Sequence, residues 1–489
     1  MLFNSLDFAI FFPIVFLLYW LVSKHLKTRN ALILVASYLF YGWWDWRFLF
    51  LIAISSLIDY YVGKQLYKTD EKKRRKGLLL ISLFVNLGFL FYFKYANFFI
   101  ESFVDAFSLF GKQLDITVLN IILPVGISFY TFQTLSYTID IYRKQLKPTN
   151  GALSFFAFVA FFPQLVAGPI ERASHLLPQF YKTYKFNYKQ VKSGLLLMAF
   201  GLFKKMVIAD RVAILVNQVY NNPSDYYGVD VILATVLFAF QIYCDFSGYS
   251  DIAIGAARSM GFDLMKNFDS PYFSKSITEF WRRWHISLST WFRDYVYIPL
   301  GGSRNGKYRT YANLFIVFLV SGLWHGAAMT FVIWGAIHGI IIVFEKAISK
   351  QRKSIYSKLN LKKEGVIRNL IFTPIVFSIV CFAWIFFRAN NLSDALTLIS
   401  NISFSNVSNL TNGKIYDLGL VKPEFIVAVL SILSLLIFEW IHKKSNMQNV
   451  VAKQILPIRW LFYLIIVFTI LIFGIYGENQ VSEFIYFQF

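Results

Sequence analysis

Apolar stretches recur along the whole chain and are separated by short polar or basic segments. A helix that crosses a bilayer needs about 20 mostly apolar residues. The stretches that approach this length lie at residues 6–22, 30–44, 47–63, 77–98, 118–141, 194–221, 231–257, 369–388, 423–441 and 459–476. Two further apolar segments, 151–169 and 311–345, are predicted to form intramembrane hairpins. The pattern predicts an all-α polytopic membrane protein of about 10–12 transmembrane helices, forming a single membrane domain over residues 1–489.

The composition supports a membrane protein. Hydrophobic residues make up 57% of the chain and charged residues only 15%, against about 25% in a typical soluble domain. These values exclude a disordered chain, a soluble globular enzyme and a nucleic-acid-binding module. The net charge of +21 is expected when Lys and Arg are concentrated in cytoplasmic loops. We therefore place the basic segments 64–76, 346–368 and 442–459 in the cytoplasm, and we expect the lipid bilayer, not nucleic acid, as a partner.

Residues 258–309 are too polar to span a membrane and are rich in Arg, Trp and Tyr. We expect cytoplasmic or interfacial helices here, packed under the transmembrane bundle. Trp281, Trp284, Leu288 and Trp291 share one face at helical spacing. Such a stripe is typical of the membrane interface, where amphipathic rings are favoured, and the pattern alone favours that interpretation.

His325 lies inside the second hairpin, within the run SGLWHGAA at 321–328. The hairpin is too short for two spans of about 20 residues each, so its turn is predicted to lie within the bilayer. His325, about 14 residues along, would then lie roughly 20 Å deep. An ionisable residue at that depth is a functional-site candidate, and a neutral imidazole can accept a proton from a hydroxyl. A histidine hydrogen-bonded between helices is an equally good interpretation.

Two other histidines deserve comparison with His325. His285 borders the tryptophan stripe, and from the residues alone a packed interfacial histidine is the favoured interpretation. His338 follows His325 in the same hairpin, but on one helix it would be turned about 220° away. We therefore do not pair it with His325.

Two polar groups could bind ligands or stabilise the bundle. The glycine-rich basic loop 301–309 offers Arg304, Lys307 and Arg309 as candidates for binding phosphates, although a flexible cytoplasmic turn is equally plausible. Asp245 and Asp251 lie within the span 231–257, close in sequence to Arg258. Both a wet cavity wall and an Asp–Arg pairing remain open for these acids. No metal-binding pattern is recognised.

The central motifs resemble those of a known family. Residues 279–302 (EFWRRWHISLSTWFRDYVYIPLGG) and 321–327 (SGLWHGA) resemble the membrane-bound O-acyltransferase family. Segments 41–45, 123–132, 161–170 and 483–489 also fit, so the resemblance covers almost the whole chain. Within that family the chain is most similar to the bacterial alginate O-acetyltransferase branch, whose members acetylate exported polysaccharides.

The resemblance implies a fold built around a central tunnel, with His325 as the catalytic histidine and His285 as the second motif histidine. The residues expected to support or line the site are Trp324, Trp281, Arg282, Arg283, Trp291, Asp294, Asp245 and Asp251. The resemblance also implies cytoplasmic acetyl-coenzyme A as donor and no metal. It further implies an extracytoplasmic SGNH-hydrolase-like acetyltransferase subunit as partner, a polysaccharide acceptor, and a location in the bacterial plasma (inner) membrane.

Three alternatives belong to other activities. The related teichoic-acid branch transfers D-alanine, a lipid-linked sugar transporter or flippase would also bury ionisable groups, and a scaffold subunit would need no catalytic histidine. A transporter would not consume a thioester, so release of coenzyme A by the purified protein discriminates it from an acyltransferase.

Overall fold

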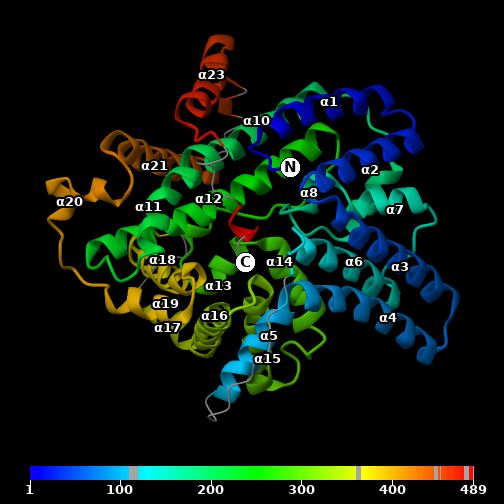
Figure 1. The fold of residues 1–489 in the computed structure, drawn as a ribbon, viewed down its shortest axis with the longest axis horizontal. Helices are drawn as coiled ribbons and strands as arrows, with labels where there is room; N and C mark the ends of the chain where they lie inside the picture. The colour runs from blue at the N-terminus through cyan, green and yellow to red at the C-terminus, as the bar shows by residue number, and fades with distance from the viewer. Residues whose placement is uncertain are drawn as a thin grey trace. The chain divides into compact units, whose positions relative to one another are not determined.

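The computed structural model describes residues 1–108, 119, 121–359, 365–444, 450–451, 453–477 and 484–487. Within these residues the protein is helical and contains no strand (Figure 1). Seven helices among them are long and apolar enough to cross a membrane, judged by length and composition. The prediction of an all-α polytopic protein is thus confirmed. The chain contains two compact units, residues 1–195 with 252–265, and residues 196–251 with 266–489.

The first unit consists mainly of N-terminal helices. Its elements are α1 (Leu6–Val22), α2 (Leu26–Gly42), η1 (Trp46–Phe48), α3 (Leu49–Lys68), α4 (Lys72–Leu90), η2 (Phe91–Tyr95), α5 (Ala96–Ser108), α6 (Ile127–Tyr142), α7 (Ala152–Val159), α8 (Phe162–Leu165), α9 (Ala173–Leu176) and η3 (Leu177–Tyr181). Ser5 caps α1 by accepting a hydrogen bond from the Phe8 amide, which satisfies an N–H that has no partner within the helix.

A buried polar network joins α3, α4 and α6 in this unit. The Asp59 carboxylate is fully buried and accepts hydrogen bonds from Ser82, from Asn86 at 2.9 Å and from Thr138 at 3.1 Å. Polar groups inside a membrane bundle must find partners within the protein. The network therefore holds the three helices in one register.

The second unit contains the remaining helices. Its elements are η4 (Phe203–Ala209), α11 (Asp210–Tyr220), η5 (Pro271–Phe273), α13 (Ile277–Arg283), α14 (Ile286–Phe292), η6 (Arg293–Tyr297), α15 (Gly306–His325), α16 (Met329–Ala347), α17 (Ser349–Lys358), α18 (Val366–Arg388), α19 (Leu392–Ser400), α20 (Asn409–Asn412), η7 (Lys414–Leu418), α21 (Lys422–Lys444), α23 (Leu456–Phe473) and η8 (Ile485–Phe487). Helices α10 (Tyr188–Leu202) and α12 (Val229–Ser259) contribute residues to both units.

Several predicted spans are shorter or more broken than expected. The span 118–141 yields a helix only from Ile127, because Pro124 lacks an N–H and Gly126 has a φ of 73° (residues 118 and 120 lie outside the described part). The span 194–221 is interrupted by the π-helix η4. In the segment 151–169 two short helices, α7 and α8, flank a break before Pro163.

The predicted hairpin 311–345 is formed by α15 and α16, with the turn at residues 326–328. The helices have 20 and 19 residues, and α16 alone is long and apolar enough to cross a membrane. The hairpin is longer than the 35 residues predicted, because the basic residues after 305 are already helical and extend α15. The depth of its turn in the bilayer stays a prediction. A Cβ on Gly322 would lie 2.3 Å from the Phe331 carbonyl oxygen, so only glycine permits this close packing.

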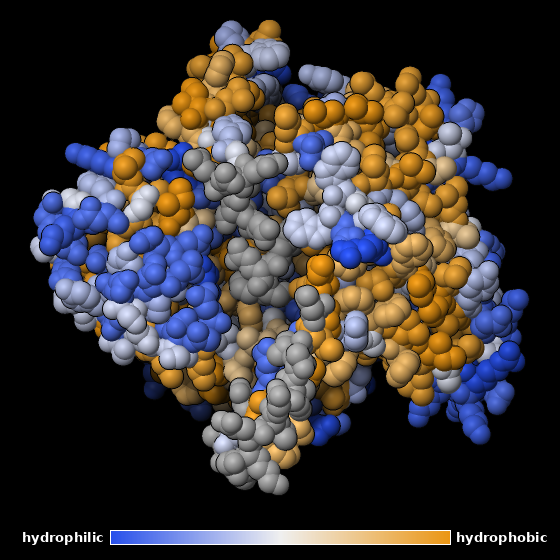
Figure 2. Space-filling view, in the orientation of Figure 1, coloured by the Kyte–Doolittle hydropathy of each residue, from blue (hydrophilic) through white to orange (hydrophobic). Residues whose placement is uncertain are grey.

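The outer surface carries many large apolar side chains. They line α1, α21 and α23, and Figure 2 shows apolar residues over much of the visible face. No residue of α23 is buried inside the protein. Exposed apolar area of this extent is expected where lipid, not water, covers the helices.

Candidate functional site

His325 is the last residue of α15, at the turn of the hairpin, and only 2% of its surface is exposed. Its ring centroid lies 5.0 Å from that of Trp334 and 5.4 Å from that of Phe387. The next residue must be glycine, because a Cβ on Gly326 would lie 2.1 Å from the Phe331 ring. Close packing at the turn thus holds the imidazole against α16 and α18.

His285 occupies the break between α13 and α14. Its backbone has φ 44° and ψ 55°, in the left-handed region that side-chain-bearing residues seldom adopt. Such strain persists only where the surroundings enforce it, and it concentrates at functional sites. The His285 side chain is fully buried. The strained residue also ends α13, so residues 281–291 are two helices and not one.

The expected tryptophan stripe therefore does not exist as a single helical face. Trp281, Trp284 and Trp291 are 7%, 0% and 6% exposed, and the Trp284 ring lies 5.2 Å from that of Trp384. The interfacial interpretation is wrong, because these rings are buried within the second unit. Large aromatic rings suit a buried core as well as a membrane interface, so sequence spacing alone could not separate the two.

The structure brings His285 and His325 together. Their ring centroids are 6.2 Å apart. Trp324 lies 5.8 Å and Phe246 4.7 Å from the His285 ring, and the Tyr486 ring lies 5.5 Å from that of His325. We call these five residues the histidine cluster. It is assembled from α12, the 285 break, the end of α15 and the C-terminal segment.

The electrostatic setting keeps His285 neutral. Burial lowers the pKa of His285 to about 3, because the charged imidazolium would lose its hydration. At physiological pH the ring therefore carries one donor and one acceptor nitrogen. A buried neutral imidazole of this kind can orient a polar reactant through a hydrogen bond.

A buried ion cluster anchors the C-terminal wall of this site. The Lys205 ammonium lies 2.8 Å from both Asp210 and Asp245, and the second oxygen of Asp245 accepts a hydrogen bond from the Ile485 amide at 2.8 Å. Tyr486, whose ring lies 6.4 Å from that of His285, is the next residue. Asp245 therefore lies outside the cluster and holds the segment that carries Tyr486.

Of the two alternatives left open for Asp245 and Asp251, the pairing with Arg258 is not the one that the structure shows. Asp245 pairs with Lys205 and Asp251 pairs with Lys204, both from η4. Arg258 instead donates a hydrogen bond to the Ser193 hydroxyl at 3.2 Å. Arg258 was a candidate partner because it lies close to both acids in the sequence. Lys204 and Lys205 are distant in sequence and come close to α12 only through tertiary packing.

His338 is closer to the site than its spacing suggested. Trp281 donates a hydrogen bond to Nδ1 of His338 at 3.3 Å, and the Trp334 ring lies 5.0 Å from both His338 and His325. The angular argument against pairing assumed one continuous helix, but the turn at 326–328 intervenes. Trp334 therefore links the two histidines without direct contact between them.

Four aromatic residues that pack against the two histidines were not predicted individually from the sequence: Tyr486, Phe246, Trp334 and Phe387. The aromatic run at the C-terminus was one available signal, and it entered only as part of the family resemblance. The others lie in apolar helices, where nothing in the sequence separates a site wall from an ordinary core.

Several expected site residues lie outside the cluster. Arg283 pairs with Glu279 at 2.9 Å, Asp294 pairs with Arg293 at 2.7 Å, and Trp291 packs on Tyr295 with centroids 4.9 Å apart. The remaining cationic candidates are exposed: Arg282, Arg304, Lys307 and Arg309. Within the described residues, no group of three or more His, Cys, Asp or Glu side chains could hold a metal ion.

Known proteins with similar sequences show which family shares these motifs. The profile of the membrane-bound O-acyltransferase family matches residues 44–388. A probable alginate O-acetylase AlgI from Pseudomonas aeruginosa is 42% identical over 398 residues, covering 81% of this chain and 73% of that protein. A peptidoglycan O-acetyltransferase from Helicobacter pylori is 35% identical over 432 residues, covering 82% and 80%.

A more distant relative is a teichoic acid D-alanyltransferase from Bacillus subtilis, 28% identical over 286 residues, which covers 55% of this chain and 69% of that protein. The family match spans both central motifs and both clustered histidines. The chain, a multi-pass helical protein, therefore belongs to the membrane-bound O-acyltransferase family and is an O-acyltransferase.

Proposed function

We propose that the protein transfers acetyl groups from cytoplasmic acetyl-coenzyme A to hydroxyls of an exported cell-surface polysaccharide, from the bacterial inner membrane. The observation that carries the proposal is the pair of buried histidines, with ring centroids 6.2 Å apart, inside an aromatic cluster. Two relatives are named as an alginate O-acetylase and a peptidoglycan O-acetyltransferase. Their names support acetyl as the transferred group and a polysaccharide as the acceptor.

His325 is the proposed general base. Its imidazole accepts the proton of an acceptor hydroxyl while the hydroxyl oxygen attacks the thioester carbonyl. The C–O bond forms, the C–S bond breaks, and the proton on His325 passes to the departing thiolate. A covalent acyl-histidine intermediate would also conserve atoms and charge, and trapping it distinguishes the two routes.

His285 is proposed to orient the reactants. Because burial keeps its ring neutral, it can offer a hydrogen bond without a fixed charge beside the thioester. The strained backbone of this residue supports a role that geometry must enforce.

The donor is proposed to bind from the side of the 301–309 loop. Arg304, Lys307 and Arg309 are exposed there, around the first turn of α15, whose last residue is His325. Exposed guanidinium and ammonium groups suit the phosphates of coenzyme A. An extracytoplasmic SGNH-hydrolase-like subunit is the proposed recipient of the acetyl group before it reaches the sugar.

The decisive experiment is ester analysis of the surface polysaccharide in cells that make wild-type protein or His325→Ala. Base-labile groups are released and identified by mass, and membrane levels of both proteins are measured in parallel. We expect acetate from the wild type and none from the variant. Equal ester in both strains at equal expression would remove His325 from the chemistry.

D-alanyl transfer is the second candidate, because a teichoic acid D-alanyltransferase is among the relatives. The same ester analysis separates the two, since D-alanine and acetate differ in mass. The transporter alternative loses its support, because the family shared by the chain consists of acyltransferases.

A further inference from the structure

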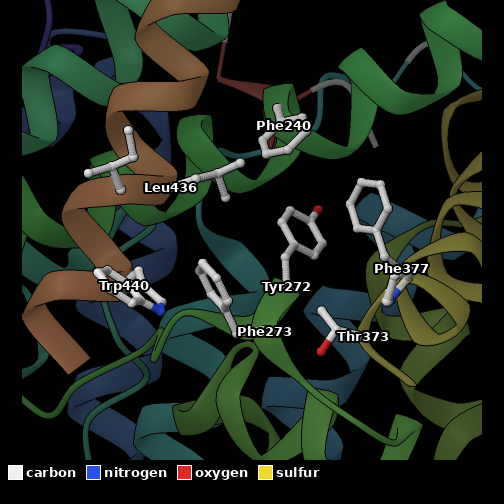
Figure 3. A pocket seen from close by; sticks show the side chains of 9 residues that line it. Phe240, Tyr272, Phe273, Thr373, Phe377, Leu436 and Trp440 are labelled. Carbon is white, nitrogen blue, oxygen red and sulfur yellow. The ribbon is translucent and has the colours of Figure 1, made fainter. Parts of the chain in front are cut away.

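A pocket lies in the second unit, on a different part of α12 from the histidine cluster. It has a volume of about 450 Å³ and lies between α12, η5, α18 and α21 (Figure 3). Its lining residues are Phe240, Tyr272, Phe273, Thr373, Pro374, Phe377, Leu436, Ile437 and Trp440. This volume falls within the usual range for ligand pockets.

The walls of this pocket are apolar. The ring of Tyr272 lies 5.7 Å from that of Phe240 and 5.1 Å from that of Phe377. The Tyr272 hydroxyl donates to the Ala239 carbonyl, so the most polar group of the wall is already satisfied. A pocket of this kind suits a hydrocarbon chain and offers little to a sugar or nucleotide.

The pocket is separated from the histidine cluster by a layer of tryptophans. Trp284 is fully buried, with ring centroids 6.0 Å from Tyr272 and 5.2 Å from Trp384. Trp384 in turn lies 5.8 Å from Trp334, which contacts His325. A molecule in the pocket therefore does not reach the reacting atoms.

The pocket opens beside two helices that are candidate membrane spans. α18 and α21 are both long and apolar enough to cross a bilayer, and Ile437 and Trp440 are 59% and 51% exposed. Trp440 lies near the end of its span, where tryptophan marks the boundary between hydrocarbon and headgroups. A chain that enters between these helices therefore comes from the bilayer.

Cations gather at the same end of the pocket. Lys275 follows two residues after Phe273, and Lys443 follows one turn after Trp440 on α21. Lys443 is close enough to Lys275 and Arg283 for their like charges to interact. Arg283 has carboxylate partners in Glu279 and Asp269, whereas Lys443 makes no ion pair with any described residue. Lys443 also interacts with the carboxylates of Glu279 and Asp269, so the three cations exceed the two carboxylates by one charge. The remaining positive charge is complementary to an anion at the level of the headgroups.

We propose that the pocket binds one acyl chain of an anionic membrane phospholipid, whose phosphate lies against Lys443 and Lys275. The apolar cavity would hold the acyl chain, and the two lysines would bind the phosphate of the headgroup. The site does not depend on the acetyl-transfer proposal, because it is built from other residues.

The test uses the full-length protein purified in mild detergent and measured by native mass spectrometry. Phosphatidylglycerol and phosphatidylcholine with identical acyl chains are titrated separately. We expect one tightly held phosphatidylglycerol per protein, bound at least about tenfold more tightly than phosphatidylcholine, on the basis of two headgroup lysines. Equal affinity for the two lipids would overturn the proposal.

Variants locate the site. The double variant Lys275→Gln with Lys443→Gln should abolish the preference for phosphatidylglycerol. The variant Ile437→Trp should weaken the binding of both lipids, because the larger side chain fills the cavity. The matched control is Lys350→Gln with Lys353→Gln, which removes the same charge from exposed positions on α17 and should keep the preference. An unchanged preference in the first pair, or an equal loss in the control, would contradict the assignment.

Inorganic phosphate separates a lipid from a free anion. At millimolar concentration it should fail to displace phosphatidylglycerol, because the chain supplies part of the affinity. Displacement by phosphate alone would mean that the lysines hold a free anion and that the pocket plays no part.

Discussion

Two histidine sites in this protein tune the same side chain in opposite directions. In the second unit, burial lowers the pKa of His285 to about 3. In the first unit, His175 is 43% exposed at its side chain, and its Nδ1 lies 2.7 Å from the fully buried Glu171 carboxylate. The hydrogen bond to Glu171 raises the pKa of His175. Aromatic walls thus keep one ring neutral, whereas a carboxylate favours the charged form of the other.

The difference separates a site suited to chemistry from one suited to structure. A histidine that orients reactants beside a thioester is best kept neutral, as burial keeps His285. His175 is held by Glu171, which also accepts the Met265 amide, and Gln179 bonds both the amide and the carbonyl of Asp263. These contacts tie residues 171–179 to 263–265 within the first unit. His175 therefore belongs to a structural clasp.

The largest expected effect is the difference in acetyl-transfer activity between His325→Ala and His175→Ala. Loss of a general base costs about 10²–10⁴-fold. We expect His325→Ala to lower coenzyme A release from acetyl-coenzyme A to background, while His175→Ala stays within about threefold of wild type. Purified proteins are compared at equal concentration. A similar loss of coenzyme A release in both variants would contradict the assignment of His325 to the chemistry and of His175 to the structure.

The second largest loss of activity is expected for substitutions of His285. The new residue must be able to adopt the left-handed backbone conformation of this position. Asn tolerates the left-handed conformation better than Ala, so His285→Asn removes the imidazole with less added strain. We expect about a hundredfold loss of transfer in both variants and a lower melting temperature for His285→Ala. Wild-type turnover by His285→Asn would remove this residue from the site.

Tyr486 tests the C-terminal wall of the histidine cluster. Tyr486→Ala removes a ring in contact with both histidines, and we expect at least about a tenfold loss of transfer through disordered packing. Tyr486→Phe keeps the ring and isolates the hydroxyl. A Phe variant as inactive as the Ala variant would show that the hydroxyl itself takes part, and full activity of Tyr486→Ala would exclude this wall from the site.

The smallest effect is on stability as a function of pH, and its sign should differ between the sites. The folded-state pKa of His285 lies below its ordinary value of 6.5, so its contribution is lost as pH falls below 6.5, by about 2 kcal/mol at pH 5. The folded-state pKa of His175 is raised, so its contribution is complete below the ordinary value and is lost as pH rises above it.

Melting temperatures of wild type, His285→Asn and His175→Gln, measured from pH 5 to pH 9, check both signs. We expect His285→Asn to lose less stability on acidification, and His175→Gln to lose less on alkalinisation. Parallel curves for all three proteins would contradict the opposed tuning of the two histidines.

Some features were accessible from the sequence because they are local. The recurrence of apolar stretches predicted a polytopic helical protein, and the motif around His325 was enough to carry the family resemblance. Span boundaries were less accurate where Pro124 and the π-helix η4 interrupt the helical pattern. Hydropathy averages over such breaks, because it depends on composition and not on backbone hydrogen bonds.

The partners of buried charges and rings were decided only by tertiary structure. Lys205 meets Asp245 across the fold, and Tyr486 approaches His325 from the far end of the chain. The burial of Trp284, and the link from His325 through Trp334 to His338, depend on how helices pack and turn. The sequence by itself determined which segments are apolar and which residue types carry chemistry. Contacts between distant segments depend on the path of the chain in space, which no local pattern encodes.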